Sequence, residues 1–499
     1  MTTFNDFLKN LNLDQNPFSQ FTTENETEKF DYIFTQPNDY ESIKNNLSSD
    51  NSMIILGDRG VGKTALIQDL VKQVKGKNNI SILITDFSDL EENFQSKELY
   101  HFLITKISFA LFSSLAIDKK RIKKLDKEEK ILLSYLLKNF VPQISKAYLR
   151  DQIKKIQVPW YKLYYKNMEN IIKGLFNYGG TVASTIADDF ISKHLSGLPP
   201  ITENVKIKEY FPELDVNFEE EFLEQNVSYS LIERIIYIIK KLDYKNIIIF
   251  IDRIDEDQRF DNDAEAIANY IKTILTDNKI LLTRNLQIVF TTWTTPFNFI
   301  KQEIRTQKHN FSTLNWSIND LENVMNKRLR AYSNDLLNDY KKIFSSEVDE
   351  NDFALIFNLS NSNPRDLWHI FSSLLRTQYN KDSTSSTIEK TSISYGLNTF
   401  IRNFNYYEYY PKKVNARANS MDIYSYIELL LKLDTDTFTA RQLKDKTQIN
   451  YSTAQNYITS MEKIGLISLI NPDSGTAQYV IRDPKISYAR QKGIKIYRS

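Results

Sequence analysis

In the first two thirds of the chain, short runs of apolar residues alternate with stretches that repeat apolar residues at helical spacing. Uninterrupted apolar runs of this length are typical of strands that are covered on both faces of a parallel sheet. Strands of this kind alternating with helices predict an α/β fold with a doubly wound parallel sheet. The predicted strands are Ser52–Leu56, Ile80–Thr85, Ile247–Ile251 and Leu286–Thr291, with Phe311–Trp316 as a weaker fifth.

The second and third predicted strands are separated by far more sequence than one helix and a short loop would need. Apolar residues in this interval, such as Leu99, Leu103 and Ile107, recur at helical spacing. We therefore expect a large, mostly helical insertion at residues 90–240.

The first strand runs into a glycine-rich loop and then into the amphipathic stretch Ala65–Val74. This strand, loop and helix fit the pattern G-x-x-x-x-G-K-[ST], in which backbone N–H groups converge on a phosphate at the start of a helix. The pattern predicts a P-loop that binds ATP, with Lys63 between the β- and γ-phosphates and the Thr64 hydroxyl on Mg²⁺. The predicted contact residues are Gly57, Asp58, Arg59, Gly60, Val61, Gly62, Lys63, Thr64 and Ala65.

A P-loop needs an acidic partner at the tip of a neighbouring strand, and the run Ile247–Ile251 ends in Asp252. We predict that Asp252 helps to hold Mg²⁺. Asp255 and Glu256 follow closely, and one of these carboxylates is expected to polarise the attacking water.

This acidic sequence resembles the Walker B region of NACHT and related STAND ATPases, which belong to the wider AAA+ and origin-recognition branch of P-loop proteins. The resemblance lies in an apolar strand, Asp252, two further residues and then Asp255-Glu256. It implies that Asp252 handles the metal and that the later pair assists hydrolysis, with Glu256 as the better candidate. Arg253 departs from the family pattern, because many relatives have a small residue at this place.

In the same branch, a polar residue at the end of the next strand contacts the γ-phosphate or the water, which implies this role for Thr291 or Thr292. The sequence Ser362-Asn363-Pro364-Arg365 resembles the Gly-Asn-Pro-Arg start of the lid helix in STAND-like proteins. The resemblance implies that Arg365 senses the γ-phosphate. Candidates for an arginine that reaches a neighbouring subunit's nucleotide are Arg305, Arg328 and Arg330.

The end of the chain has its own order of elements. Three predicted helices are followed by a strand hairpin over Leu466–Ile470 and Ala477–Ile481, which is the order of a winged helix-turn-helix. The predicted helices are Ile423–Leu433, Ala440–Thr447 and Ser452–Ile464. The predicted domains are an N-terminal leader (1–50), the ATPase core (51–318), a helical lid and connector (319–420) and the winged helix (421–499).

Winged domains of this type end origin-recognition and STAND-like ATPases, which implies possible contact with DNA. The module contains 11 basic and 8 acidic side chains, a small excess without a dense patch. Contact with DNA and contact with protein therefore both stay open. The residues that would face bases are Tyr451, Ser452, Thr453, Gln455 and Asn456.

Composition narrows the chemistry further. The chain has no cysteine, which excludes disulfides and thiol catalysis and fits a reducing cytoplasm. The net charge of +1 indicates no general affinity for nucleic acid. No stretch reaches the roughly 18 apolar residues of a membrane span, so no membrane contact is expected. The four histidines are scattered without ligand spacing, so we predict no zinc site.

These patterns favour an ATP-binding and ATP-hydrolysing switch that needs Mg²⁺. By resemblance, the switch controls homo-oligomerisation and activates a separately encoded effector protein, in bacterial defence against phage. One alternative is a DNA-binding remodelling or loader ATPase of the origin-recognition or transposition-regulator type. A second alternative is a scaffold that binds a nucleotide without hydrolysing it.

Overall fold

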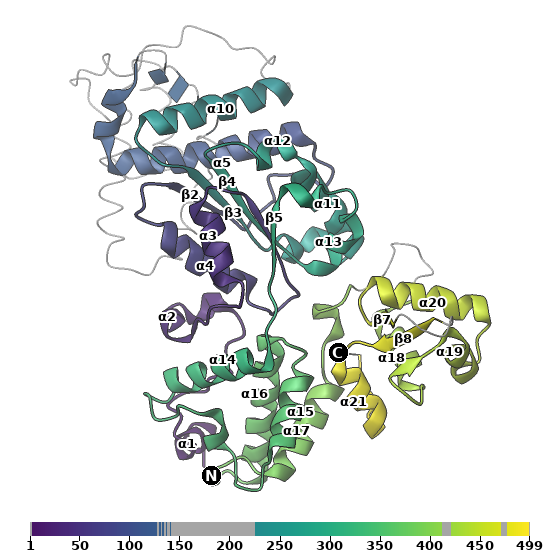
Figure 1. Ribbon diagram of the computed structural model, residues 1–499. Helices are drawn as coiled ribbons and strands as arrows, with labels where there is room; N and C mark the ends of the chain where they lie inside the picture. The colour runs from purple at the N-terminus through teal and green to yellow at the C-terminus, as the bar shows by residue number, and fades with distance from the viewer. Residues whose placement is uncertain are drawn as a thin grey trace, which may run out of the picture.

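The computed structural model describes residues 2–126, 129–130, 132–133, 136, 140, 225–411, 421–470 and 477–498 (Figure 1). Much of the predicted insertion at 90–240 lies outside these residues. Its described parts are the helices α5 (Ser96–Ile117) and α10 (Gln225–Lys241) and the 3₁₀ helix η2 (Lys119–Lys124). Among the described residues, no helix is both long and apolar enough to span a bilayer.

Five parallel strands of the described chain form one sheet in the order β2-β3-β4-β1-β5. The register pairs Leu56 with Thr292 and Ile251 with Phe290, so the carboxyl ends of β1, β3 and β4 meet at one edge. The strands are β1 (Met53–Leu56), β2 (Ile80–Ile84), β3 (Ile247–Ile251), β4 (Leu286–Thr292) and β5 (Asn310–Thr313).

Helices cover both faces of this sheet (Figure 1). One face packs against α3 (Tyr40–Ser48) and α4 (Lys63–Val74), and the other against α5, α10, α11 (Ala264–Thr276) and α13 (Thr294–Ile300). Successive residues of β1 alternate between the two apolar clusters. The predicted doubly wound α/β fold is therefore confirmed.

Strand β2 differs from its prediction as a strand covered on both faces. It lies at the edge of the sheet, and Ser81 and Leu83 are exposed, with 47% of Leu83 accessible. In this run an apolar residue does not indicate burial, because Leu83 is apolar and yet faces outward.

Below the sheet in Figure 1, four helices form the lid. They are α14 (Ile318–Ala331), α15 (Glu350–Leu359), α16 (Pro364–Lys381) and α17 (Lys390–Arg402). The N-terminal segment is more than a leader, because Phe7 and Leu8 of α1 (Phe4–Asn10) are fully buried in the same apolar cluster as these helices. Helix α2 (Phe30–Ile33) packs against α14.

The C-terminal module has the predicted winged-helix order, α18 to α20 and then the hairpin of β7 and β8. Two elements were missed, the strand β6 (Thr437–Phe438) and the final helix α21 (Pro484–Lys492). A two-residue strand leaves no periodic pattern in a sequence. The predicted elements are α18 (Ile423–Leu431), α19 (Ala440–Thr447), α20 (Tyr451–Lys463), β7 (Ile467–Ile470) and β8 (Gln478–Ile481).

A buried charge cluster joins this module to the lid. Lys485 of α21 lies 2.8 Å from Asp366 of α16 and 3.2 Å from Asp483, and the Lys485 side chain is only 2% exposed. The Tyr410 hydroxyl donates to Asp483 at 3.0 Å. Tyr410 ends the connector segment, Asn405–Tyr410, which leads from the lid towards the winged helix.

Candidate nucleotide-binding site

The glycine-rich loop has the backbone that its sequence predicts. Gly60 and Gly62 have φ of 87° and 95°, in the left-handed region that favours glycine. A Cβ on Gly60 would also lie 2.5 Å from Oδ1 of Asn363 in the lid. Helix α4 begins at Lys63, two residues before its predicted start, and no side chain caps its first turn. Its leading N–H groups are therefore available to an anion.

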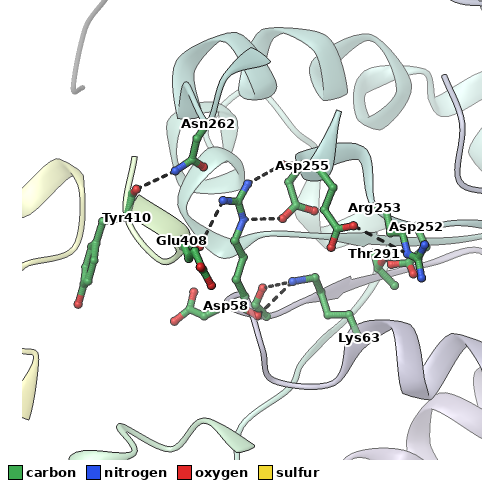
Figure 2. A network of polar contacts seen from close by, with 12 residues as sticks. Asp58, Lys63, Asp252, Arg253, Asp255, Asn262, Thr291, Glu408 and Tyr410 are labelled. Carbon is green, nitrogen blue, oxygen red and sulfur yellow. Dashed lines mark hydrogen bonds and ion pairs between the residues drawn. The ribbon is translucent and has the colours of Figure 1, made fainter. Parts of the chain in front are cut away.

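Lys63 lies over this loop. Its ammonium donates to the carbonyl oxygen of Gly57 at 2.9 Å. It also donates to that of Asp58 at 3.1 Å, and Figure 2 shows Lys63 directed towards Asp58. The loop is also held from behind, because the Trp316 indole donates to the Val61 carbonyl at 2.9 Å. Trp316 ends the predicted fifth strand, although β5 itself stops at Thr313.

Asp252 lies at the tip of β3, only 1% exposed. The Thr291 hydroxyl donates to its Oδ1, whereas its Oδ2 is buried and accepts no hydrogen bond of normal geometry from the described residues. Burial raises the pKa of Asp252, although the Thr291 hydroxyl opposes this shift. The Thr64 hydroxyl is also close enough to favour the charged form of the same carboxylate and so to lower its pKa. A buried carboxylate oxygen without a partner, close to the phosphate loop, fits a hard divalent cation such as Mg²⁺. Thr291 thus contacts Asp252 directly.

The two carboxylates that follow have different surroundings. Asp255 is 3% exposed in its side chain and forms an ion pair with Arg59, with 3.1 Å between Arg59 Nε and Asp255 Oδ2. Lys63 and Arg59 lower the pKa of Asp255 despite its burial. The Glu256 side chain is 59% exposed and lies 4.0 Å from Arg253. Partial burial and the Asp255 charge raise the pKa of Glu256.

Arg253, the departure from the family pattern, has a left-handed backbone with φ of 65°. This conformation is uncommon for a residue with a side chain. Arg253 is the residue before the 3₁₀ helix η4 (Ile254–Glu256), which carries both acidic candidates. The turn therefore sets the direction in which Asp255 and Glu256 leave the strand.

The start of the lid helix lies directly on the phosphate loop. Asn363 caps α16, and its Nδ2 donates to the Arg59 carbonyl at 2.6 Å. Its Oδ1 accepts from the backbone N–H of Arg365 at 3.0 Å. Pro364 occupies the first turn, as its sequence position suggests. Arg365 is therefore brought to the loop and the acidic tip within one chain.

A cavity of about 390 Å³ lies between these parts. Its phosphate end is lined by Gly60–Ala65, Asp252, Glu256 and Arg365. Aromatic side chains also line the cavity, and those of the N-terminal segment were missed in the sequence because this segment shows no clear periodic pattern. The aromatic lining residues are Phe21, Phe30, Phe34, Trp316 and Trp368.

The arginines considered for contact with a neighbouring subunit differ in exposure. Arg328 is buried and pairs with Glu26, with 3.1 Å between Nη1 and Oε2. Its side chain is used inside the chain, so the suggestion that Arg328 reaches a neighbour is wrong. Arg330 is exposed and pairs with Asp335, and Arg305 is exposed.

No model of a known protein family matches the sequence, and a search of curated proteins finds no relative. Among the solved structures that match is that of the Aeropyrum pernix ORC2 protein in ADPNP and ADP complexes, which aligns with 93% of this chain and 97% of its own. The two share 9% sequence identity, and the TM-score is 0.36.

Proposed function

We propose that this protein binds ATP with Mg²⁺ and hydrolyses it. The observation that carries the proposal is the meeting of three features at one cavity: the phosphate loop, the Asp252 oxygen without a partner, and the accessible Glu256. The α4 N-terminus and Lys63 would hold the phosphates, and Thr64 and Asp252 would hold the metal. Mg²⁺, when bound, would neutralise charge on the phosphate oxygens.

We assign the remaining roles from the same geometry. Glu256 takes the proton of the attacking water, because its carboxylate is accessible whereas that of Asp255 is paired with Arg59. Thr291 orients Asp252 through its hydroxyl. Arg365 lies at the lid edge of the cavity, where it would respond to the charge of the γ-phosphate.

Replacing Lys63 tests the nucleotide site. Lys63→Ala should weaken ATP binding by about 100-fold, since it removes a charge-assisted contact from a buried loop. Binding is measured by calorimetry, and turnover by phosphate release with Mg²⁺ and after chelation. Lys77→Ala, an exposed lysine just beyond α4, is the control and should match the wild type. Wild-type protein that neither binds nor hydrolyses ATP would rule out the proposal.

We also propose a switching role, in which nucleotide state controls assembly with further copies of this chain and activation of a separately encoded effector. The contact between lid and phosphate loop supports a response of the lid to nucleotide. A role in defence against phage rests on the family resemblance alone. A scaffold without hydrolysis is the alternative, and the accessible Glu256 favours the enzyme.

We favour protein rather than DNA as the partner of the winged helix. Several of its basic side chains are already paired, including Lys485 with Asp366, Arg490 with Asp436 and Lys446 with Asp434. Full-length protein should therefore give no gel shift with duplex DNA, even at low salt. A salt-sensitive shift that is lost in Tyr451→Ala, on the exposed start of α20, would instead support the loader alternative.

A further inference from the structure

The Arg59 side chain directs its donors to groups outside the phosphate loop. Nε donates to Asp255 Oδ2 at 3.1 Å, and Nη2 donates to the Asp255 carbonyl at 2.5 Å. The third nitrogen, Nη1, donates to the Glu408 carbonyl at 3.3 Å. The guanidinium also lies 4.4 Å from the centre of the Trp293 ring. One planar group thus contacts both the acidic tip of β3 and the connector segment.

A second side chain of the core holds the same segment. Asn262, just after the acidic tip, donates from Nδ2 to the carbonyls of Tyr407 and Tyr410, the latter at 2.9 Å. Figure 2 shows Asn262, Asp255 and Glu408 around this junction. Arg59 and Asn262 therefore bind three backbone carbonyls of Asn405–Tyr410.

Two tyrosine side chains of the connector segment, Tyr407 and Tyr410, reach residues of the winged-helix module. The Tyr407 hydroxyl donates to Asp422, the residue that caps α18, and the Tyr410 hydroxyl donates to Asp483 at 3.0 Å. Asp483 in turn belongs to the buried cluster with Lys485 and Asp366. The segment is thus bound by the ATPase core through its backbone and by the winged helix through its tyrosines.

From these contacts we infer that Arg59 is a positioning residue that couples docking of the winged-helix module to ATP hydrolysis at the tip of β3. The inference rests on the proposed function, because it names a control on that same reaction. Arg59 acts through Asp255, which precedes Glu256 on the short helix η4. A docked connector fixes the guanidinium, the guanidinium fixes Asp255, and η4 then presents Glu256 to the water.

The direction of the effect follows from this geometry. Release of the connector removes one of the partners that fix Arg59, so η4 becomes less ordered and turnover slows. Small displacements of a catalytic group reduce rates by as much as about 100-fold. The phosphate contacts of the loop are made by backbone N–H groups and by Lys63, so the affinity for ATP should change little.

Variants at the two anchoring side chains test the coupling. Asn262→Asp replaces the amide donor with a carboxylate facing two carbonyls, and should lower kcat about tenfold with KM for ATP within about twofold. Arg59→Met should lower kcat about 100-fold. Arg59→Lys keeps a cation beside Asp255 but cannot span Asp255 and Glu408 together, so it should resemble Asn262→Asp. The double variant Arg59→Lys/Asn262→Asp should lose no more than either change alone.

Hydrogen exchange of the full chain provides a readout that does not depend on activity. Backbone amides of residues 403–410 should exchange faster in Asn262→Asp and Arg59→Lys than in the wild type. Asn10→Asp is the matched control, because Asn10 also donates from Nδ2 to a backbone carbonyl, that of Thr384 at 3.3 Å. It should keep wild-type exchange and kcat. Thermal melting identifies any variant that fails to fold, and Arg59→Lys is the milder substitute for Arg59→Met.

Each outcome decides the inference. Faster exchange with a lower kcat and an unchanged KM supports it. Faster exchange with wild-type kcat overturns the coupling, and unchanged exchange overturns the clamp on the connector. If wild-type protein does not hydrolyse ATP, the proposed function itself fails. If the wild type turns over and the variants match it, only the coupling fails.

Discussion

Glu256→Gln should lower kcat for ATP hydrolysis by about 1000-fold while leaving the affinity for ATP close to that of the wild type. The loss follows because glutamine cannot accept the proton of the attacking water, and general base catalysis contributes about 10² to 10⁴ in rate. Binding should survive because Glu256 is half-exposed at the rim of the cavity, whereas the phosphates would be held by the loop and Lys63. Phosphate release and calorimetry measure the two quantities.

The control for this variant is Glu347→Gln, an exposed glutamate between α14 and α15 of the lid. It should hydrolyse ATP like the wild type. The Glu256→Gln protein should also accumulate with ATP bound, so mass photometry of this variant would display any assembly that ATP promotes. A variant that keeps the wild-type rate would remove Glu256 as the base and return Asp255 as the candidate.

Lys485→Met should destabilise the protein by about 3–5 kcal/mol, the usual cost of removing one partner from a buried ion pair. Lys485 is the cation between Asp366 and Asp483, and all three side chains are at most 2% exposed. Without it, two carboxylates stay buried beside each other. The measurement is unfolding in urea, followed by circular dichroism, with the winged-helix region expected to be lost first.

Lys390→Met is the matched control, since Lys390 also pairs with two carboxylates, Asp349 at 2.8 Å and Asp352 at 2.9 Å, but is 44% exposed. Exposed pairs contribute less than about 1 kcal/mol. Asp366 and Asp483 raise the pKa of Lys485 in spite of its burial. The contribution of Lys485 to the stability of the fold is therefore complete at neutral pH, and it declines only as pH rises through the raised pKa. Equal losses in the two variants would contradict a special role for the buried cluster.

The sequence was sufficient for the fold because the core strands carry a strong local signal. The runs that became β1 and β3 are apolar throughout, that of β4 is largely apolar, and all three are buried on both faces. The loop between β1 and α4 has a fixed length and composition. Helix α4 begins two residues before its predicted start, because a helix that begins at a phosphate loop needs no capping side chain to mark it in the sequence. Edge strand β2 looked like a core strand because Leu83 is apolar although it is exposed.

The contacts that surround the candidate site could not be predicted from local patterns in the sequence. Arg59 meets Asp255 across 196 residues of sequence, and Asn363 meets the Arg59 carbonyl across 304. Neither pair shares a local pattern, so only the fold reveals that Asp255 is paired while Glu256 is accessible. The catalytic and binding roles of the predicted residues remain predictions, whereas their proximity is now a structural fact.

The burial of the N-terminal segment under the lid has a consequence for synthesis of the chain. Phe4 contacts Tyr379 at 5.2 Å between ring centres, and Phe18 contacts Phe371 at 5.3 Å. The aromatic residues of this segment therefore have no partner until α16 has been synthesised. During this interval their aromatic side chains are open to chaperones or to other nascent chains. The candidate nucleotide cavity likewise forms only after α16 has been made, because Phe21 and Trp368 both line it.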